Sequence, residues 1–356
     1  MDTIRWDYYP RVARTAPARD WLLLLAQLQK APKTIDAYAR GLDDLIDFFT
    51  RSNFPLIEAH HGHIATYLND LHQRVSARPA RRSQPIKCGL ANATIQQRLT
   101  AARLWYDYLI LHNLRRDQVN PVGRGTYSHG IPVTGSPKRG LLPHYRQQPW
   151  IPGDDEWDHL LTIVLREESL RNQLMVLLAY EGALRRSELV ALGVADIDWP
   201  QRIITIRAEI TKNKCQRLMF YGDATQELLV AYMAHRQTLL VGTKQLRSGP
   251  LFVSESKRNR GHALSVDMWN KIVQRLAKRA GLPQFTTHTF RHLRLTDYAR
   301  AKLELYEIAL LAGHKHLEST QLYINLSGGD LGDRVRAATQ HITERLRQKV
   351  AATNQG

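Results

Sequence analysis

The chain has 356 residues, 43% of them hydrophobic, and its 50 Lys plus Arg residues exceed its 33 Asp plus Glu residues to give a formal net charge of +17. A chain of this length corresponds to about two domains of typical size. So large a positive charge favours a polyanionic partner, and nucleic acid is the commonest one. The two cysteines, Cys88 and Cys215, exclude a disulfide framework and a cysteine-based zinc site.

The sequence contains no segment that predicts export or membrane insertion. The N-terminal MDTIRWDYYP lacks the apolar core of a signal peptide. The longest apolar runs, such as LLLLA at 22–26, are much shorter than a membrane span. We therefore predict a soluble, cytoplasmic protein that does not bind membranes.

The first 119 residues are predicted to form an all-helical domain. In KTIDAYARGLDDLIDFFTR (33–51) and ANATIQQRLTAARLWYDYLILHNL (91–114), apolar residues recur at the spacing of a helix. Asn92 or Thr94 is predicted to cap the start of the second helix. The basic, proline-containing stretch between the helices, at 76–87, predicts a loop.

The next segment, 120–152, predicts a linker. It contains six prolines with glycines between them, and no continuous helix tolerates that proline density. The expected organisation is a helical domain over 1–119, this basic linker, a second domain over 153–330, and a C-terminal amphipathic helix over 331–356.

The second domain is predicted to be mostly helical. Asp154 or Asp155 can cap its first helix, and another apolar helix follows at 169–183. The segments 202–210 and 215–221 alternate like two strands, and TKNK between them predicts a turn. Together with the first domain, this gives a mainly α fold with a small antiparallel sheet. Further helices are predicted at 224–239, 266–280, 288–301, 303–312, 316–326 and 333–350.

The pentapeptide HTFRH suits a phosphate site. His288 and Arg291 are three residues apart and share one face of a helix, where a forked guanidinium and an imidazole can both donate to phosphate oxygens. Incidental charges on a surface helix are the alternative. His288 and His292 also have the spacing of a metal pair, but Thr289 replaces the glutamate of HExxH and no cysteine lies nearby. No metal site is therefore predicted.

Three other segments carry candidate residues, and each is ambiguous by itself. Arg185 follows an apolar helix, so it could simply end that helix and pair with Glu188. Lys212 and Lys214 occupy the TKNK turn, where lysine is ordinary. Tyr323, alone, is typical of a half-buried helical aromatic residue. Only the combination of these segments with HTFRH favours a catalytic site.

In chain order, GALRRSELVALGVADID, ITKNK, HTFRH and AGHKHLESTQLY resemble the tyrosine recombinase family, the phage integrases, which include the Xer-type recombinases. The last segment has a nine-residue step from His314 to Tyr323. The resemblance covers about residues 150–330. A weaker likeness relates the helices near 33–51 and 91–114 to the family's core-binding, SAM-like domain. The sequence departs from the usual family pattern at four places, none of which removes a catalytic side chain. These are Ala183 before the Leu-Arg pair, Phe290 in HTFRH, the nearby His316 and the long linker.

The resemblance implies a catalytic set and a mechanism. The arginines and two histidines would hold the phosphate, the tyrosine would form a covalent 3′-phosphotyrosine, and the lysine would protonate the leaving 5′-oxygen. No ATP, metal ion or other cofactor is implied. The implied catalytic residues are Arg185, Lys212, with Lys214 as its rival, His288, Arg291, His314 and Tyr323.

Double-stranded DNA is the implied partner. The resemblance implies a dimer on each DNA site and a tetramer in synapsis. The C-terminal helix would join the protomers by docking an apolar face on a neighbouring protomer; packing on its own domain is the alternative. The face consists of Val335, Ala338, Ile342, Leu346 and Val350. Helices at 33–51 and 91–114 are candidates for the major groove, although plain solvation is the favoured interpretation of each side chain taken alone. The candidate base-reading residues are Thr34, Arg40, Thr94, Gln97 and Arg98.

We therefore expect a site-specific DNA recombinase of a mobile genetic element, an integrase or a transposase-like enzyme, which accessory DNA-binding proteins could assist. The alternative is a DNA-binding protein on the same fold that no longer cleaves. A metal-dependent nuclease is disfavoured because Glu181 and Glu188 do not form a convincing carboxylate pair. A type IB topoisomerase shares the chemistry and would differ by relaxing DNA without site preference.

Overall fold

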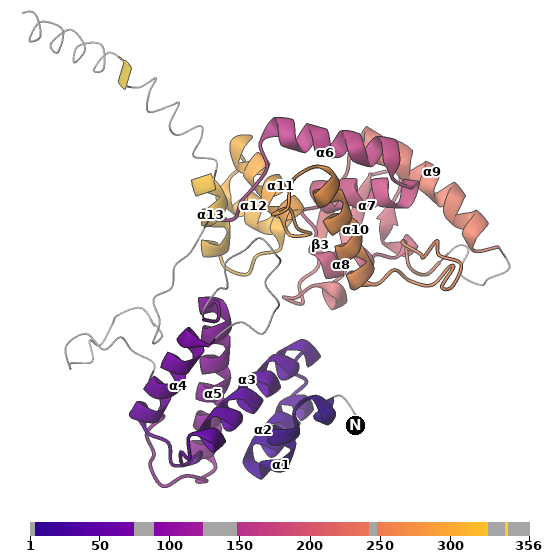
Figure 1. Cartoon of the computed structure of the whole chain (residues 1–356). Coiled ribbons are helices and arrows are strands. Elements are labelled where there is room, and N and C mark those ends of the chain that lie inside the picture. The colour runs from indigo at the N-terminus through magenta and orange to yellow at the C-terminus, as the bar shows by residue number, and fades with distance from the viewer. Residues whose placement is uncertain (1–3, 75–88, 124–147, 242–247, 327–338, 341–356) are drawn as a thin grey trace, which may run out of the picture. The chain divides into compact units, whose positions relative to one another are not determined.

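The computed structural model describes residues 4–74, 89–123, 148–241, 248–326 and 339–340, which belong to two compact units, Met1–Arg146 and Gln147–Gly356 (Figure 1). The predicted fold class, mainly helical with a small antiparallel sheet, is confirmed. The predicted loop at 76–87, most of the linker, and the C-terminal helix with its apolar face lie outside the described residues. Within the described part of the chain, no helix is long and apolar enough to cross a membrane.

Helices are the only regular elements among the described residues of the first unit. Its core forms where α3 and α5 pack along each other, and Gly41 permits their close approach, since a Cβ there would lie 3.1 Å from the Cβ of Ala101. Trp105 and Tyr106 of α5 are fully buried in this core. The elements are η1 (Trp6–Tyr8), α1 (Pro10–Arg14), α2 (Ala16–Gln27), α3 (Pro32–Arg51), α4 (His61–Gln73) and α5 (Asn92–Leu111).

Two predicted helix caps are wrong. Helix α5 begins at Asn92 behind Ala91, so Asn92 and Thr94 both lie inside the helix and neither caps it. Helix α6 (Asp154–Glu167) is preceded by Gly153, whose N–H donates to Glu156 Oε2 at 2.9 Å. Its aspartates occupy the first turn instead, where negative charge interacts favourably with the helix dipole.

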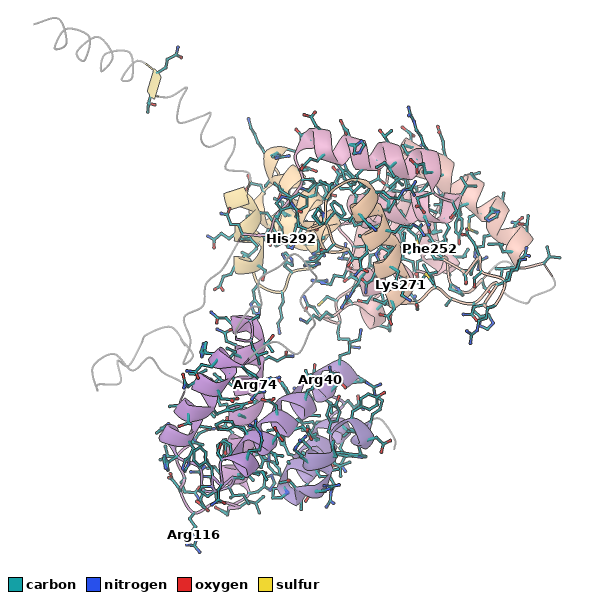
Figure 2. All side chains as sticks on the ribbon, viewed as in Figure 1. Arg40, Arg74, Arg116, Phe252, Lys271 and His292 are labelled. Carbon is teal, nitrogen blue, oxygen red and sulfur yellow. The ribbon has the colours of Figure 1, made fainter. Side chains whose placement is uncertain are left out.

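The second unit surrounds an aromatic core. Trp157, Trp269, Phe285 and Phe290 contact one another there, and Phe252 is buried in the same cluster (Figure 2). Phe290 therefore anchors the HTFRH segment from behind. The helices after α6 are α7 (Leu170–Glu181), α8 (Arg186–Val190), η2 (Val194–Asp196), η3 (Ala208–Ile210), α9 (Asp223–Leu239), α10 (Val266–Arg279), α11 (Thr289–Arg300), α12 (Leu305–Ala312) and α13 (Glu318–Leu326).

The sheet has three antiparallel strands in the order β1 (Ile197–Asp198), β2 (Ile203–Ile206) and β3 (Arg217–Phe220). Ile206 of β2 pairs with Arg217 of β3, and both side chains are buried. The strand predicted over 202–210 ends at Ile206, because Ala208–Ile210 turns into a 3-10 helix. The β2–β3 connection thus leaves the sheet early, and its turn at 211–214 approaches the end of α12.

Candidate active site

Four of the six predicted catalytic residues, Arg185, Lys212, His288 and His314, line one cavity of about 660 Å³ in the second unit. The other two are buried against His314, which lines the cavity: Arg291 is 1% exposed and lies 2.8 Å from His314 Nε2, and Tyr323 is 3% exposed with its ring 6.2 Å from that of His314. Arg186, Lys315 and His316 also line the cavity. The structure therefore brings the four ambiguous sequence segments together around a strongly basic pocket, which suits a phosphate-bearing ligand.

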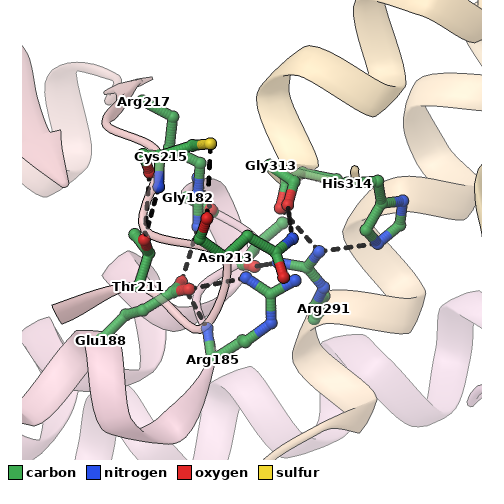
Figure 3. Close-up of polar contacts among 12 residues, drawn as sticks. Gly182, Arg185, Glu188, Thr211, Asn213, Cys215, Arg217, Arg291, Gly313 and His314 are labelled. Carbon is green, nitrogen blue, oxygen red and sulfur yellow. Dashed lines mark hydrogen bonds and ion pairs between the residues drawn. The ribbon is translucent and has the colours of Figure 1, made fainter. Parts of the chain in front are cut away.

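Arg185 is oriented by a buried carboxylate. Its backbone N–H donates to Glu188 Oε2 at 3.0 Å and its guanidinium pairs with Oε1 at 2.7 Å (Figure 3). Glu188 is fully buried and also pairs with Arg217 at 2.8 Å. Burial raises the pKa of the Glu188 carboxyl, but the charge of Arg217 and the hydrogen bonds from Arg185 outweigh it, so the pKa lies below its ordinary value. Glu188 therefore stays ionised and holds both guanidiniums.

Arg217 connects three segments of the site. Its Nη1 donates to the carbonyls of Gly182, at 3.1 Å, and Leu311, at 2.8 Å, while its Nη2 pairs with Glu188. Burial of a guanidinium is costly unless its N–H groups find acceptors, and both Nη atoms of Arg217 have them. Arg217 therefore fixes β3 to the end of α7 and to the end of α12. The sequence reasoning did not identify this residue, whose position on an alternating strand carries no local signal of that role.

Arg291 determines the protonation of His314. The guanidinium donates to the carbonyls of Ala183, at 2.8 Å, and Ala312, at 2.7 Å, and lies 2.8 Å from His314 Nε2. Arginine only donates, so Nε2 must accept and the ring proton resides on Nδ1, from which it is donated to Thr320 Oγ1 at 2.8 Å. Burial, reinforced by the charge of Arg291, lowers the pKa of His314 to about 3, so the ring is neutral at pH 7.

The β2–β3 turn is tied to the turn that carries His314. Helix α12 ends at Ala312, and Gly313 adopts the left-handed conformation with φ 62°. The Asn213 side chain donates to the Gly313 carbonyl at 2.9 Å (Figure 3). This contact brings Lys212, the neighbour of Asn213, to the cavity. Lys214, its rival from sequence, does not line that cavity.

Tyr323 lies against two histidines. Its hydroxyl is 3.0 Å from Nδ1 of His292, and its ring is nearly parallel to that of His314 at a centroid distance of 6.2 Å. Burial raises the pKa of Tyr323, and the charges of Arg291 and Arg185 partly oppose that rise. His292, labelled in Figure 2, was considered from sequence only as half of a metal pair. The only sequence feature that could have pointed to a place in the site is its position directly after Arg291.

The five residues predicted to read DNA lie on α3 and α5 of the first unit. Arg40 is exposed and pairs with Asp36 at 2.8 Å (Figure 2). Arg98 is half-buried and pairs with Asp44 at 2.6 Å, so it also joins the two helices. Their contact with DNA stays a prediction. Of the others, Thr34 and Thr94 are half-buried and Gln97 is exposed.

Gly313→Ala is expected to lower the free energy of unfolding by about 1–3 kcal/mol, because an L residue is strained at φ 62° and the new Cβ would lie 2.8 Å from Arg217 Cδ. Gly281→Ala is the matched control: its φ is 72°, but nothing lies within 4 Å of the added Cβ. Chemical denaturation of both variants measures the difference. Equal destabilisation would contradict close packing at Gly313.

The chain is similar to known proteins over most of its length. Residues 153–328, which include the whole cavity, match the model of the phage integrase family. The tyrosine recombinase XerC of Pelotomaculum thermopropionicum is 28% identical over 317 residues, covering 87% of this chain and 93% of the relative. The tyrosine recombinase XerD of Caulobacter vibrioides is 26% identical over 325 residues, covering 90% of this chain and 93% of that protein.

Solved structures share the fold. The XerH site-specific recombinase bound to its palindromic difH substrate, a post-cleavage complex, aligns with a TM-score of 0.63 at 19% identity, covering 85% of this chain and 79% of that one. The Tn1549 transposon integrase in complex with transposon right-end DNA aligns with a TM-score of 0.57 at 14% identity, covering 85% of this chain and 92% of that one. The chain therefore belongs to the phage integrase family of tyrosine recombinases, enzymes that break and rejoin DNA.

Proposed function

We propose that this recombinase cuts and rejoins duplex DNA at specific sites through a covalent 3′-phosphotyrosine on Tyr323. The observation that carries the proposal is the meeting of Arg185, Arg291 and His314 around the cavity beside which Tyr323 is buried. Phosphoryl transfer requires mainly positioning and stabilisation of negative charge. A basic cavity with a tyrosine packed behind one of its lining histidines offers both.

Each residue has a role in this proposal. Arg185, held by Glu188, and Arg291, held by two carbonyls, would bind the non-bridging oxygens of the phosphate. His288 lines the cavity and has a pKa lowered to about 4, by burial and then by Arg291, so it would act as a neutral hydrogen-bonding group. His314 would hold the Arg291 guanidinium in place, since its Nε2 accepts from Arg291. The Tyr323 oxygen would attack phosphorus as the bond to the 5′-oxygen breaks.

Lys212 is proposed as the acid that protonates the leaving 5′-oxygen. Lys212→Ala is expected to slow formation of the covalent adduct by about 10²- to 10⁴-fold, whereas Lys214→Ala is expected to change it less than about threefold, because only Lys212 of the two lines the cavity. A substrate with sulfur in place of the bridging 5′-oxygen should restore the Lys212→Ala rate, since a thiolate leaves without a proton. Single-turnover cleavage measures both rates. The opposite ranking would assign the acid to Lys214.

We further propose a two-domain organisation on DNA. The first unit would contact the duplex through α3 and α5, the segment 120–152 would follow the backbone, and phosphate contacts would supply most of the affinity with a steep salt dependence. Related proteins of this fold were solved in complex with DNA. Two protomers would occupy each site and four would form the synapsis, joined by the C-terminal segment 331–356, with accessory DNA-binding proteins as further partners.

A mobile genetic element is the proposed biological setting. The Tn1549 transposon integrase among the similar structures favours an integrase or transposase-like role. The proline-rich linker predicted at 120–152 is also longer than the linker of Xer-type members. The experiment is to incubate the purified chain with the DNA that flanks its gene, on a supercoiled plasmid. Sequencing of the products would reveal excision, integration or exchange between two copies of one site.

The cleavage chemistry is tested in the same reaction. Denaturing gels would detect DNA attached covalently to protein, and peptide mapping would locate the attachment. Attachment to Tyr323 through a 3′-phosphate is the expected result. Tight, site-specific binding without attachment would favour the alternative, a DNA-binding protein on this fold that does not cleave. Relaxation of any plasmid without site preference would indicate a type IB topoisomerase activity.

A further inference from the structure

We propose that His292 is the group that takes the proton from the Tyr323 hydroxyl during cleavage and returns it during ligation. This inference rests on the proposed role of Tyr323 as the nucleophile and extends it. The carrying observation is geometric: Nδ1 of His292 lies 3.0 Å from the Tyr323 hydroxyl. That separation is within the reach required of a general base.

The other groups near the hydroxyl cannot take its proton in this arrangement. The Nε2 of His314 already accepts from Arg291, and its Nδ1 carries a proton directed to Thr320. Arg291 stabilises a tyrosinate by its charge but is a donor and accepts no proton.

His288 has a different position. Its ring meets the His292 ring edge to face, with centroids 4.5 Å apart, and it lines the cavity where the phosphate would bind. The Tyr323 hydroxyl lies 3.0 Å from Nδ1 of His292, and the hydrogen bond from Arg291 that lowers the pKa of Tyr323 comes from a group that only donates. The two histidines of HTFRH therefore have different positions: His288 lines the cavity where the phosphate would bind, and His292 lies beside the hydroxyl of Tyr323.

His292 is in the protonation state that the step requires. Burial, reinforced by the charges of the neighbouring His288 and Arg291, lowers its pKa to about 4. At pH 7 the ring is neutral, and a neutral imidazole with Nδ1 unprotonated accepts from the tyrosine O–H. The same surroundings make the imidazolium a stronger acid than an ordinary one, so it is suited to returning the proton when ligation releases the tyrosine.

The proton and electron pairs balance. In cleavage, the O–H bond of Tyr323 breaks and its proton binds Nδ1 of His292, the tyrosine oxygen bonds to phosphorus, and the bond from phosphorus to the 5′-oxygen breaks. The leaving oxygen takes a proton from Lys212. Ligation reverses every step: the 5′-hydroxyl returns its proton to Lys212 and attacks phosphorus, and the released tyrosine oxygen recovers its proton from His292. No further reactant is required.

The test compares His292→Asn with the wild-type chain, on native DNA for which the wild-type chain forms the covalent adduct. The asparagine carbonyl can accept the tyrosine hydrogen bond but cannot hold the proton. We expect adduct formation to slow by about 10²-fold or more, with unchanged DNA affinity and unfolding temperature. His159→Asn, on the exposed face of α6, is the matched control and should retain the wild-type rate.

A second measurement separates proton transfer from positioning. Incorporation of 3,5-difluorotyrosine at position 323 lowers the pKa of the nucleophile, so it should restore at least tenfold of the lost rate in His292→Asn and leave the wild-type rate nearly unchanged. A 5′-sulfur leaving group, which restores Lys212→Ala, should not restore His292→Asn. The difluorotyrosine response compares the rates of His292→Asn with tyrosine and with difluorotyrosine at position 323. Partial unfolding of His292→Asn affects both rates alike, so the ratio still reports on proton transfer.

The outcomes distinguish the two proposals. If the wild-type chain forms no adduct at Tyr323, the proposed function fails and this inference fails with it. If the wild-type chain forms the adduct and His292→Asn forms it within threefold of the same rate, only the role of His292 is overturned. A slow His292→Asn that difluorotyrosine does not accelerate would also overturn proton transfer, since it would limit His292 to holding Tyr323 in place.

Discussion

Tyr323→Phe is expected to abolish the covalent protein–DNA adduct, lowering its formation by more than about 10⁴-fold, while site-specific binding persists. The substitution removes the oxygen that would attack phosphorus and leaves the rest of the ring. Since Tyr323 is 3% exposed, phenylalanine fills the same space. The loss of one hydrogen bond, to His292, should cost about 1 kcal/mol of unfolding free energy. Denaturing gels measure the adduct and mobility shifts measure binding.

Tyr306→Phe provides the control for this substitution. Tyr306 lies on α12 and is 69% exposed, so removal of its hydroxyl should affect neither the adduct nor the stability. An adduct that persisted in Tyr323→Phe would contradict the proposed nucleophile and assign the attack to another side chain. An adduct lost from both variants would indicate that the assay responds to something other than chemistry at position 323.

Arg291→Lys is expected to lower the rate of adduct formation by about 10³-fold or more and the free energy of unfolding by about 2–4 kcal/mol. The positive charge remains, but an ammonium group cannot reproduce the planar fork of the guanidinium. Arg291 satisfies three acceptors at once, the carbonyls of Ala183 and Ala312 and the Nε2 of His314. Buried acceptors left without a donor cost about 1–3 kcal/mol each. The loss of stabilisation at the phosphate accounts for the effect on rate.

Arg300→Lys on the same helix is the matched control for Arg291→Lys. Arg300 pairs with Asp297 and Asp154 at the surface, and exposed ion pairs contribute at most about 1 kcal/mol. Chemical denaturation and single-turnover cleavage should therefore show little change. If Arg291→Lys instead cleaved within tenfold of the wild-type rate and unfolded normally, Arg291 would be neither a phosphate ligand nor a structural centre of the site.

The sequence predicted the candidate active site only when its four segments were considered together. Each segment taken alone could be explained by an ordinary structural role, such as a surface charge or a buried aromatic residue. Only the order Arg, Lys, His-x-x-Arg, His, Tyr along the chain favoured a catalytic phosphate site. The cavity lined by Arg185, Lys212, His288 and His314 is consistent with that reasoning. The contacts that hold these residues were not predicted, because Glu188 and Arg217 are 29 positions apart and a strand arginine has no periodic signature of its partner.

The amino-acid sequence by itself determined the helical periodicity, the hairpin, the strong positive charge and the order of the reactive residues, because these depend on neighbours within a few positions. Helix caps were predicted incorrectly for α5 and α6, because several polar residues competed for each cap and backbone geometry selected among them. Only the tertiary structure decided that Lys212, and not Lys214, faces the cavity. It also placed His292 against Tyr323. These pairings depend on the packing of α11 against α13 and on the anchoring of the hairpin turn, and such long-range contacts leave no local pattern in the sequence.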